Sequence, residues 1–210
     1  MKLASLLSVR EALGVEAGQD SDNAILAALD AATDDIASRL RTGFERTTAR
    51  DDFAVEISQY PAGHLVRLGL LRGFLVGTPT VTAARSPAEF GVDEIDVTAR
   101  ATVDPDKGVV SIAPDGEAGE ALGGFRPWWF RVSYTAGFTA TDGQHFDAVP
   151  EWLALAARLH ARVALSAHPM FVQNQSTADA RLLEGQLVRI LGRHARYMPW
   201  AETPRAGVVV

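Results

Sequence analysis

Five histidines and three close pairs of acidic residues are the first candidates for metal binding or proton transfer in this 210-residue sequence. His160 and His168 lie in a predicted helix, where a separation of eight residues corresponds to about 12 Å along the axis. That distance is too large for one metal ion unless the helix breaks, so histidines of a helix surface or an interface are the better interpretation. His194 lies in a basic stretch, where a solvated side chain is expected.

Two of the three acidic pairs do not converge through local geometry. Neighbours on a helix, such as Asp34 and Asp35, diverge by about 100°, and neighbours on a strand, such as Asp51 and Asp52, face opposite ways. Glu94 and Asp96 share one face of a predicted strand, for which a solvated sheet surface is the better interpretation.

Motifs of catalysis and cofactor binding are also missing from the sequence. Gly69–Gly73 lacks the lysine and hydroxyl residue of a phosphate-binding loop, and no serine lies in a nucleophile elbow. The absence of cysteine excludes disulfides and thiolate metal sites. We therefore predict that the protein is not an enzyme and that it binds no cofactor. The alternative is an enzyme or small-ligand protein with a cleft near Trp128, His145 and His160, whose catalytic groups converge only in space.

Charge is distributed unevenly along the chain. The net charge of −6 disfavours general affinity for nucleic acid, which depends on lysine and arginine contacts to phosphates. The segment from Glu151 onward contains seven arginines and four acidic residues, a local net charge of +3. The preceding residues therefore carry a net charge of −9. This polarity suits a subunit whose ends meet different partners, and a solvated helix face would also explain it.

Length and hydropathy favour one domain with an elaboration, since 210 residues with 47% hydrophobic content can bury a core. The apolar run at Met1–Glu11 is too short for a signal peptide, and no segment approaches the roughly 20 apolar residues of a membrane span. We expect synthesis in the cytoplasm and no membrane partner.

Helical periodicity marks the N-terminal part of the chain. A short helix is predicted to end at Gly14, and a longer one to start near the capping residues Ser21–Asn23 and to end at Gly43. The exposed face of the longer helix would carry Asp30, Asp34 and Arg41.

Two further helices are predicted near the C-terminus. One starts at Pro150, because proline is preferred at the first helical position, and stops before Pro169. The other follows Ser176 or Thr177 as its cap. Their apolar stripes are Trp152, Leu153, Ala156, Leu159 and Val163 in the first, and Leu182, Leu183, Leu187, Ile190 and Leu191 in the second.

Between Phe44 and Phe138, short segments rich in β-branched and aromatic residues alternate with turn residues. Within the last of these segments one of Trp128 and Trp129 should enter the core, since successive strand residues alternate sides. For the other, intramolecular cover, a subunit interface and ligand stacking are the alternatives. The predicted strands are Phe53–Ile57, Leu65–Leu68, Thr80–Ala84, Ile95–Thr98, Val109–Ile112 and Trp128–Tyr134.

The predicted fold class is therefore α+β. A helical bundle of two N-terminal and two C-terminal helices would hold a small, mostly antiparallel β-sheet inserted between them. We expect one domain over residues 1–198, with helices in 1–43, a β region in 44–138, helices in 150–196, and a C-terminal tail at 199–210.

The strand end Val132–Phe138, its loop and the helix start at Val149–Pro150 resemble the head-tail connector (adaptor) family of tailed bacteriophages and gene transfer agents. The resemblance extends in order over most of residues 1–196. Its further pieces are Asp20–Asn23, Phe53, Leu65–Leu68, Pro79–Thr82 and Asp104–Val110.

This resemblance implies a structural virion protein that forms a ring beneath the portal, dodecameric in the better-known members, and joins the DNA-filled head to the tail. The implied partners are the portal protein, neighbouring copies in the ring, and a stopper or tail-completion protein. DNA would pass through the channel without sequence-specific binding. The location would be the head-tail interface of the virion, after synthesis in the host cytoplasm. A different neck or tail-completion protein is the alternative.

The resemblance also implies two sets of site residues. The C-terminal segment of family members commonly inserts into or against the portal, and a disordered terminus is the alternative here. The corresponding portal-binding residues are Pro204, Arg205, Ala206, Gly207, Val208, Val209 and Val210. We also predict a structural hinge at Tyr134, Gly137, Phe138 and Pro150, where Gly137 lets the chain leave the sheet.

Overall fold

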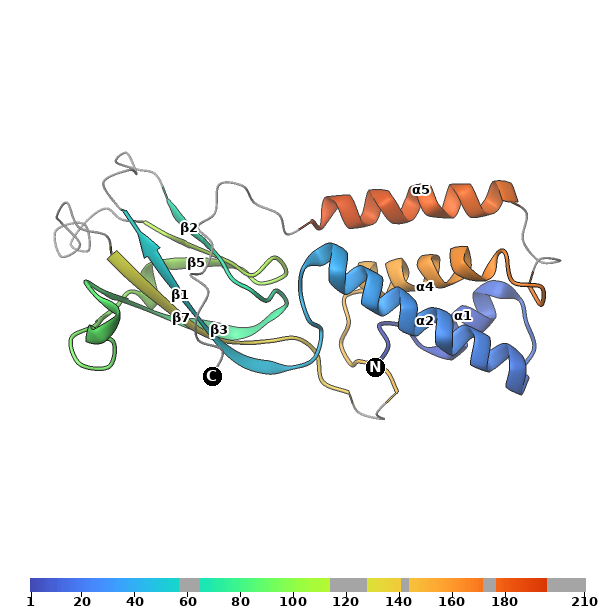
Figure 1. Ribbon diagram of the computed structural model, residues 1–210, viewed down its shortest axis with the longest axis horizontal. Helices are drawn as coiled ribbons and strands as arrows, with labels where there is room; N and C mark the ends of the chain where they lie inside the picture. The colour runs from blue at the N-terminus through green and yellow to red at the C-terminus, as the bar shows by residue number, and fades with distance from the viewer. Residues whose placement is uncertain (57–64, 114–127, 141–143, 172–176, 196–210) are drawn as a thin grey trace. The chain divides into compact units, whose positions relative to one another are not determined.

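The computed structural model describes residues 1–56, 65–113, 128–140, 144–171 and 177–195. The chain divides into two compact units, of which unit 1 consists of residues 1–41 and 138–195 and unit 2 includes residues 42–137. The α-helices lie in unit 1 and the β-strands in unit 2 (Figure 1). The α+β class is confirmed, with two N-terminal and two C-terminal helices and antiparallel strands between them.

Unit 1 begins with α1 (Leu6–Leu13), which has the ends that its sequence predicts. The Ser8 N–H donates to the hydroxyl of Ser5 at 3.3 Å, and this bond caps the helix start. Gly14 ends the helix in the left-handed region with φ of 64°, a conformation that glycine adopts without steric cost.

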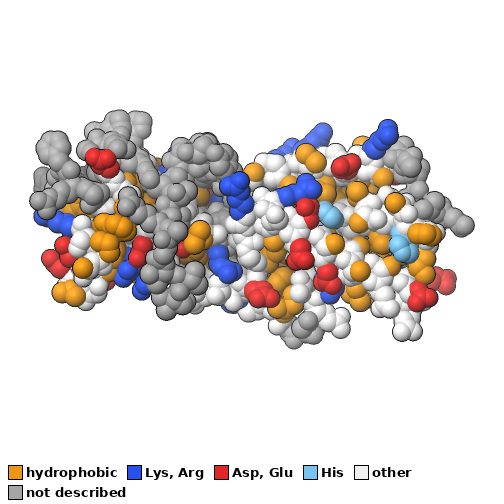
Figure 2. Space-filling model, viewed as in Figure 1, with side chains coloured by type: hydrophobic (Ala, Val, Ile, Leu, Met, Phe, Trp, Pro, Cys, Tyr) orange, Lys and Arg blue, Asp and Glu red, His pale blue; other side chains and the backbone are white. Residues whose placement is uncertain are grey.

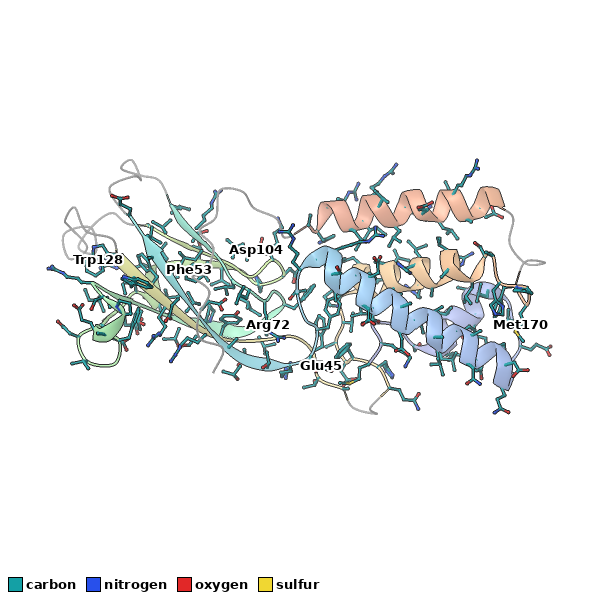
Figure 3. All side chains as sticks on the ribbon, in the orientation of Figure 1. Glu45, Phe53, Arg72, Asp104, Trp128 and Met170 are labelled. Atoms are coloured by element: carbon teal, nitrogen blue, oxygen red, sulfur yellow. The ribbon has the colours of Figure 1, made fainter. Side chains whose placement is uncertain are left out.

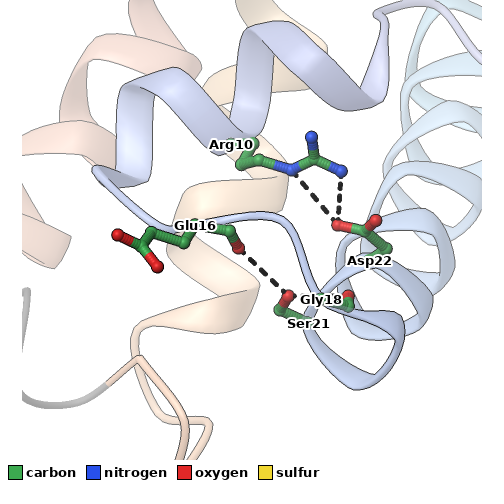
Figure 4. Close-up of polar contacts among 5 residues, drawn as sticks. All are labelled: Arg10, Glu16, Gly18, Ser21 and Asp22. Atoms are coloured by element: carbon green, nitrogen blue, oxygen red, sulfur yellow. Dashed lines mark hydrogen bonds and ion pairs between the residues drawn. The ribbon is translucent and has the colours of Figure 1, made fainter.

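Helix α2 (Gln19–Leu40) starts earlier than predicted, because Gly18 and not one of Ser21–Asn23 is the capping residue. The Ser21 hydroxyl instead donates back to the carbonyl of Gly18 at 2.8 Å (Figure 4). Asp22 pairs with the guanidinium of Arg10 at 2.6 Å. This partly buried ion pair links α1 to the first turn of α2.

The end of α2 also differs from the prediction. The helix stops at Leu40 because Arg41, with φ of 50°, takes the left-handed position that was expected near Gly43. The Arg41 N–H bonds back to the last carbonyls of the helix, which satisfies them without a glycine. The predicted exposed face is confirmed, since Asp30, Asp34 and Arg41 are all exposed.

Helix α4 (Glu151–Leu165) is the central helix of unit 1 and packs against α1, α2 and α5 (Thr177–Arg193). Alanines contribute half of its buried positions, which lets the neighbouring helices approach closely. At the α4–α5 contact, the ring of Trp152 stacks on His194 with centroids 3.8 Å apart. The buried residues of α4 are Leu153, Ala156, Ala157, Leu159, Ala161 and Leu165.

Unit 2 contains two antiparallel sheets, whereas one sheet was predicted. The first has the order β1-β7-β3-β4, and the second has the order β2-β6-β5. The described strands are β1 (Thr47–Val55), β2 (Val66–Gly69), β3 (Leu75–Ala84), β4 (Ile95–Asp96), β5 (Ala101–Asp104), β6 (Val109–Ile112) and β7 (Trp128–Ala136).

Several details of the strand prediction are wrong. Strand β1 begins at Thr47 and β3 at Leu75, before the predicted starts at Phe53 and Thr80. Strand β5 was missed because Ala101–Asp104 is short and its two β-favouring residues, Thr102 and Val103, are flanked by alanine and aspartate. Pairing with β6 across the turn 105–108 gives it its strand structure. Thr98, predicted in a strand, starts a 3₁₀ turn and its N–H donates to the Asp96 carboxylate at 2.8 Å. A hydrogen bond from the Thr98 hydroxyl, together with the one from the Thr98 N–H, lowers the pKa of Asp96.

The core of unit 2 is one apolar cluster drawn from both sheets. Phe53 of β1, labelled in Figure 3, pairs with Phe130 of β7, and both side chains are fully buried. Trp128 is only 4% exposed and Trp129 is half-buried, so the prediction that one of the two tryptophans enters the core is confirmed.

Among the helices that the structure describes, none combines the length and the apolar character needed to cross a membrane.

Candidate functional site

The predicted hinge begins at a buried polar contact in unit 2. The Tyr134 hydroxyl donates to the Asp51 carboxylate at 2.8 Å, and the Leu71 N–H donates to the same oxygen at 2.7 Å. Asp51 is 3% exposed and therefore needs these donors, since a buried carboxylate without partners is strongly destabilising. The contact joins β7, β1 and the segment after β2, so it holds the end of β7 in place.

Gly137 follows β7 and occupies a place that no other residue fits well. Its φ is 89°, and a Cβ atom there would collide with the carbonyl oxygens of Glu45 and Phe44. Its N–H donates to the Phe74 carbonyl at 2.9 Å. Glycine is thus required both by the backbone conformation and by the close approach of the chain segment that enters β1.

The chain changes unit immediately after Gly137. It passes from unit 1 to unit 2 between Arg41 and Thr42, and returns between Gly137 and Phe138. The two connections lie side by side in unit 2, because Gly137 packs on the backbone of Phe44 and Glu45. Of the predicted hinge residues, Gly137 and Phe138 therefore lie at a boundary between compact units, whereas Tyr134 lies within β7 and Pro150 at the start of α4. The role of all four as a hinge stays a prediction.

On the unit 1 side, the chain is held by short backbone pairings. The Phe138 and Phe146 rings contact at 6.2 Å between centroids, and Lys2 forms an isolated parallel bridge with His145. Pro150 is the N-cap of α4 and not its first helical residue, one position earlier than predicted. Its carbonyl accepts from the N–H groups of Leu153 and Ala154, so Pro150 still defines the helix start.

The predicted portal-binding residues Pro204 to Val210 lie outside the described residues. Their role stays a prediction.

The histidines are placed in separate contacts. His160 Nε2 lies 2.9 Å from the Asp35 carboxylate, which also pairs with Arg39 at 2.7 Å. His194 stacks on Trp152. His168 accepts from the Met170 N–H at 3.3 Å. Within the described ranges no three histidine or acidic side chains form a group that could hold a metal ion.

The acidic pairs diverge as predicted. Asp35 contacts His160 and Arg39, whereas Asp34 is exposed and forms no ion pair with a described residue. Asp51 points into the core of unit 2, whereas Asp52 forms a two-bond pair with Arg131 at 2.8 Å.

Arg131 lies on the sheet face opposite Asp51, with its guanidinium 3.9 Å from the ring centroid of Phe90. Its bonds with Asp52 raise its pKa. These contacts satisfy the cation within the sheet, which gives Arg131 and Asp52 a structural role.

The three residues named for an alternative cleft fall into different units. Trp128 belongs to unit 2, and its ring lies 5.7 Å from the Arg85 guanidinium, whereas His145 and His160 belong to unit 1.

The outward face of α5 is a feature that the sequence did not predict correctly. Leu182 was placed in the buried stripe but is 64% exposed, and Val188 is 57% exposed. The buried side instead carries Leu183, Leu187 and Leu191, which recur every four residues against α4. The sequence did contain a signal for this exposure. Neighbouring residues on a helix point about 100° apart, so Leu182 and Leu183 cannot both lie at the centre of one buried stripe.

Comparison with known proteins finds chains of similar arrangement in gene transfer agent (GTA) particles. A chain in a structure described as the neck of an empty GTA particle, computed with C6 symmetry, matches over 93% of this chain and 91% of its own, with 18% identity and a TM-score of 0.43. A chain in the virion of a native GTA particle matches over the same shares, with 19% identity and a TM-score of 0.47. No protein-family model and no curated protein matches the sequence.

Proposed function

We propose that this protein is a non-enzymatic structural component of a virion neck, a head-tail connector that forms a ring beneath the portal and joins the DNA-filled head to the tail. The motifs that carry the connector resemblance lie, in the same order, at the ends of helices and strands of this structure. Asp20–Asn23 form the start of α2, Asp104–Val110 form the β5–β6 turn, and Val132–Phe138 end β7.

The observation that carries the proposal is the assembly of unit 1. Its two N-terminal and two C-terminal helices come from opposite ends of the sequence, yet they form one compact unit around α4. The sheets of unit 2 are inserted between them in the chain. In the family that the chain resembles, a helical bundle is the body of the ring, and unit 1 would take that place. The larger β region of unit 2 departs from the minimal helical connectors.

The proposed partners follow from the same arrangement. Neighbouring copies would contact the helical unit, the tail at Pro204–Val210 would contact the portal, and a stopper or tail-completion protein would contact the side away from the portal. DNA would pass through the channel without sequence-specific binding, and the net charge of −6 suits a lumen along which a polyanion slides.

Removal of residues 199–210 tests the role of the tail. We expect the shortened chain to keep its circular-dichroism spectrum and to lose binding to purified portal from the same particle. A full-length control in which Val208, Val209 and Val210 are replaced by serine separates tail length from apolar character. Undiminished portal binding by the truncated chain would contradict the tail assignment, and absence of binding by the full chain would contradict the connector role.

A different neck or tail-completion protein is the second candidate. The observation that favours it is the size of unit 2, in which seven strands are described, because minimal connectors are mainly helical. Under this alternative the protein would bind an assembled portal-connector complex but not the portal alone.

A further inference from the structure

We infer that neighbouring copies associate by placing the outward face of α5 against the outward face of α2 in the next copy. This inference rests on the proposed ring and names the two surfaces that would build it. The α5 outer face is defined here as Arg181, Leu182, Gly185, Val188, Arg189 and Gly192, and the α2 outer face as Asp20, Ala27, Asp30, Ala31, Asp34 and Ser38.

The α5 outer face combines exposed apolar side chains with open space. It lies opposite the buried stripe of Leu183, Leu187 and Leu191 on the helix. Leu182 and Val188 are more than half exposed, and a Cβ atom on Gly185 would meet nothing within 4 Å. Glycine in a helix interior is unfavourable relative to alanine, and unit 1 alone supplies no packing reason for it. Close approach of another helix does supply one.

The α5 outer face is also positively charged. Arg181 and Arg189 are exposed, and Arg193 follows them at the helix end. None of these three arginines forms an ion pair with a described residue. The nearest acidic side chain along the helix, Glu184, lies on its flank by helical periodicity.

The α2 outer face is complementary in charge and in size. Asp20 and Asp34 are exposed and form no ion pair with a described residue, and Asp30 is 54% exposed beside Lys2 at 3.1 Å. Ala27 and Ala31 lie between these carboxylates along the helix and are exposed as well. Small side chains permit a close helix contact, and the carboxylates would meet the unpaired arginines of α5.

The two faces belong to different sides of the same unit. Both α2 and α5 pack on α4. Their buried residues lie on the packed side, so the exposed outer faces are directed away from it. In the space-filling view, basic side chains lie along α5 and acidic ones over α2 (Figure 2). Contact between two different faces is heterologous, and its repetition closes into a ring when the rotation permits.

Because the natural chain has no cysteine, thiol crosslinking can test this contact directly in the full-length protein. A double variant, Ala31→Cys with Val188→Cys, would be treated with a short bismaleimide at high protein concentration. We expect a ladder of dimers, trimers and larger species, since each copy offers both faces. The matched control, Ala12→Cys with Val188→Cys, places the first thiol on exposed α1 and should crosslink at least about tenfold more slowly.

The outcomes separate this inference from the proposed function. Crosslinking that is no faster than in the control would overturn the pairing of these two faces. A product limited to dimers, which Val188→Cys alone also forms, would overturn it as well, because it would indicate that α5 contacts α5 of the other copy. Portal binding by the same variants measures the connector role independently. A protein that binds portal without forming the ladder would thus refute the interface and leave the function standing.

Charge reversal provides the second measurement. Asp34→Arg and Arg189→Glu should each weaken self-association by roughly tenfold, the scale expected for interfacial charge pairs. A mixture of the two variants should restore it, because the unchanged α5 of the first can meet the unchanged α2 of the second, and the altered faces are again opposite in charge. Sedimentation of each variant and of the mixture provides the readout, and a mixture no better than the single variants would overturn the inference.

Discussion

The internal contacts that stabilise unit 2 differ from those that stabilise unit 1. In unit 2 the chain path depends on two features that substitution would disrupt. One is the buried Asp51 carboxylate, which accepts from Tyr134 and Leu71, and the other is Gly137, whose backbone packs closely against Glu45. In unit 1 the helices pack through alanine and leucine faces, and their outer faces remain exposed. The difference teaches that substitutions in unit 2 should act on stability, whereas substitutions on the outer faces of unit 1 should act on association.

The largest effect is expected for Gly137→Ala. The added Cβ atom would overlap two carbonyl oxygens, and alanine disfavours the backbone conformation at this position. We therefore expect the free energy of unfolding to fall by about 3 to 4 kcal/mol. Urea unfolding measures it. The matched control is Gly77→Ala, at φ of 74° with nothing within 4 Å, which should cost only about 1 kcal/mol. Equal losses in the two variants would show that the close approach at Gly137 is unimportant.

A somewhat smaller loss is expected for Asp51→Ala. The change removes the shared acceptor of the buried Tyr134 hydroxyl and the partly buried Leu71 N–H, at a cost of about 2 to 3 kcal/mol. Asp34→Ala, an exposed aspartate, serves as the control and should change stability by less than about 0.5 kcal/mol. If both variants unfold at the same urea concentration, the buried contact does not stabilise unit 2.

Arg131→Met should have an intermediate effect. It removes the two-bond pair with Asp52 and the contact with Phe90 but keeps the apolar stem, so the loss should be about 1 kcal/mol. Asp52→Asn should be similarly mild, and the double variant should show that the two losses are not additive. Full additivity would mean that the pair contributes nothing as a pair.

The smallest effect on stability is expected for Val188→Ser on the α5 outer face. An exposed side chain contributes little to folding, so the change should stay within about 0.5 kcal/mol while it weakens self-association. Leu187→Ser, on the buried side of the same helix, should instead destabilise the fold. Sedimentation and thermal unfolding of both variants compare the two faces, and a large stability loss for Val188→Ser would contradict the division between them.

Local signals made much of the fold predictable. Gly14 ends α1 as expected because only a residue tolerant of the left-handed region closes a helix there easily, and Pro150 defines the start of α4 to within one residue. The site was predictable only in part. Gly137 was recognised as a conformational requirement, but its contact with Glu45 depends on a chain segment more than 90 residues away.

The amino-acid sequence by itself determined the α+β class, the order of the helices and of all strands except β5, and the burial of one of the two adjacent tryptophans. These properties follow from periodicity and backbone stereochemistry within a few residues. Only the tertiary structure decided which surplus apolar residues stay exposed on α5, that Arg41 ends α2, that β5 pairs with β6, and that Asp51 meets Tyr134 from 83 residues away. Such outcomes depend on which elements pack together, and no local pattern carries that information.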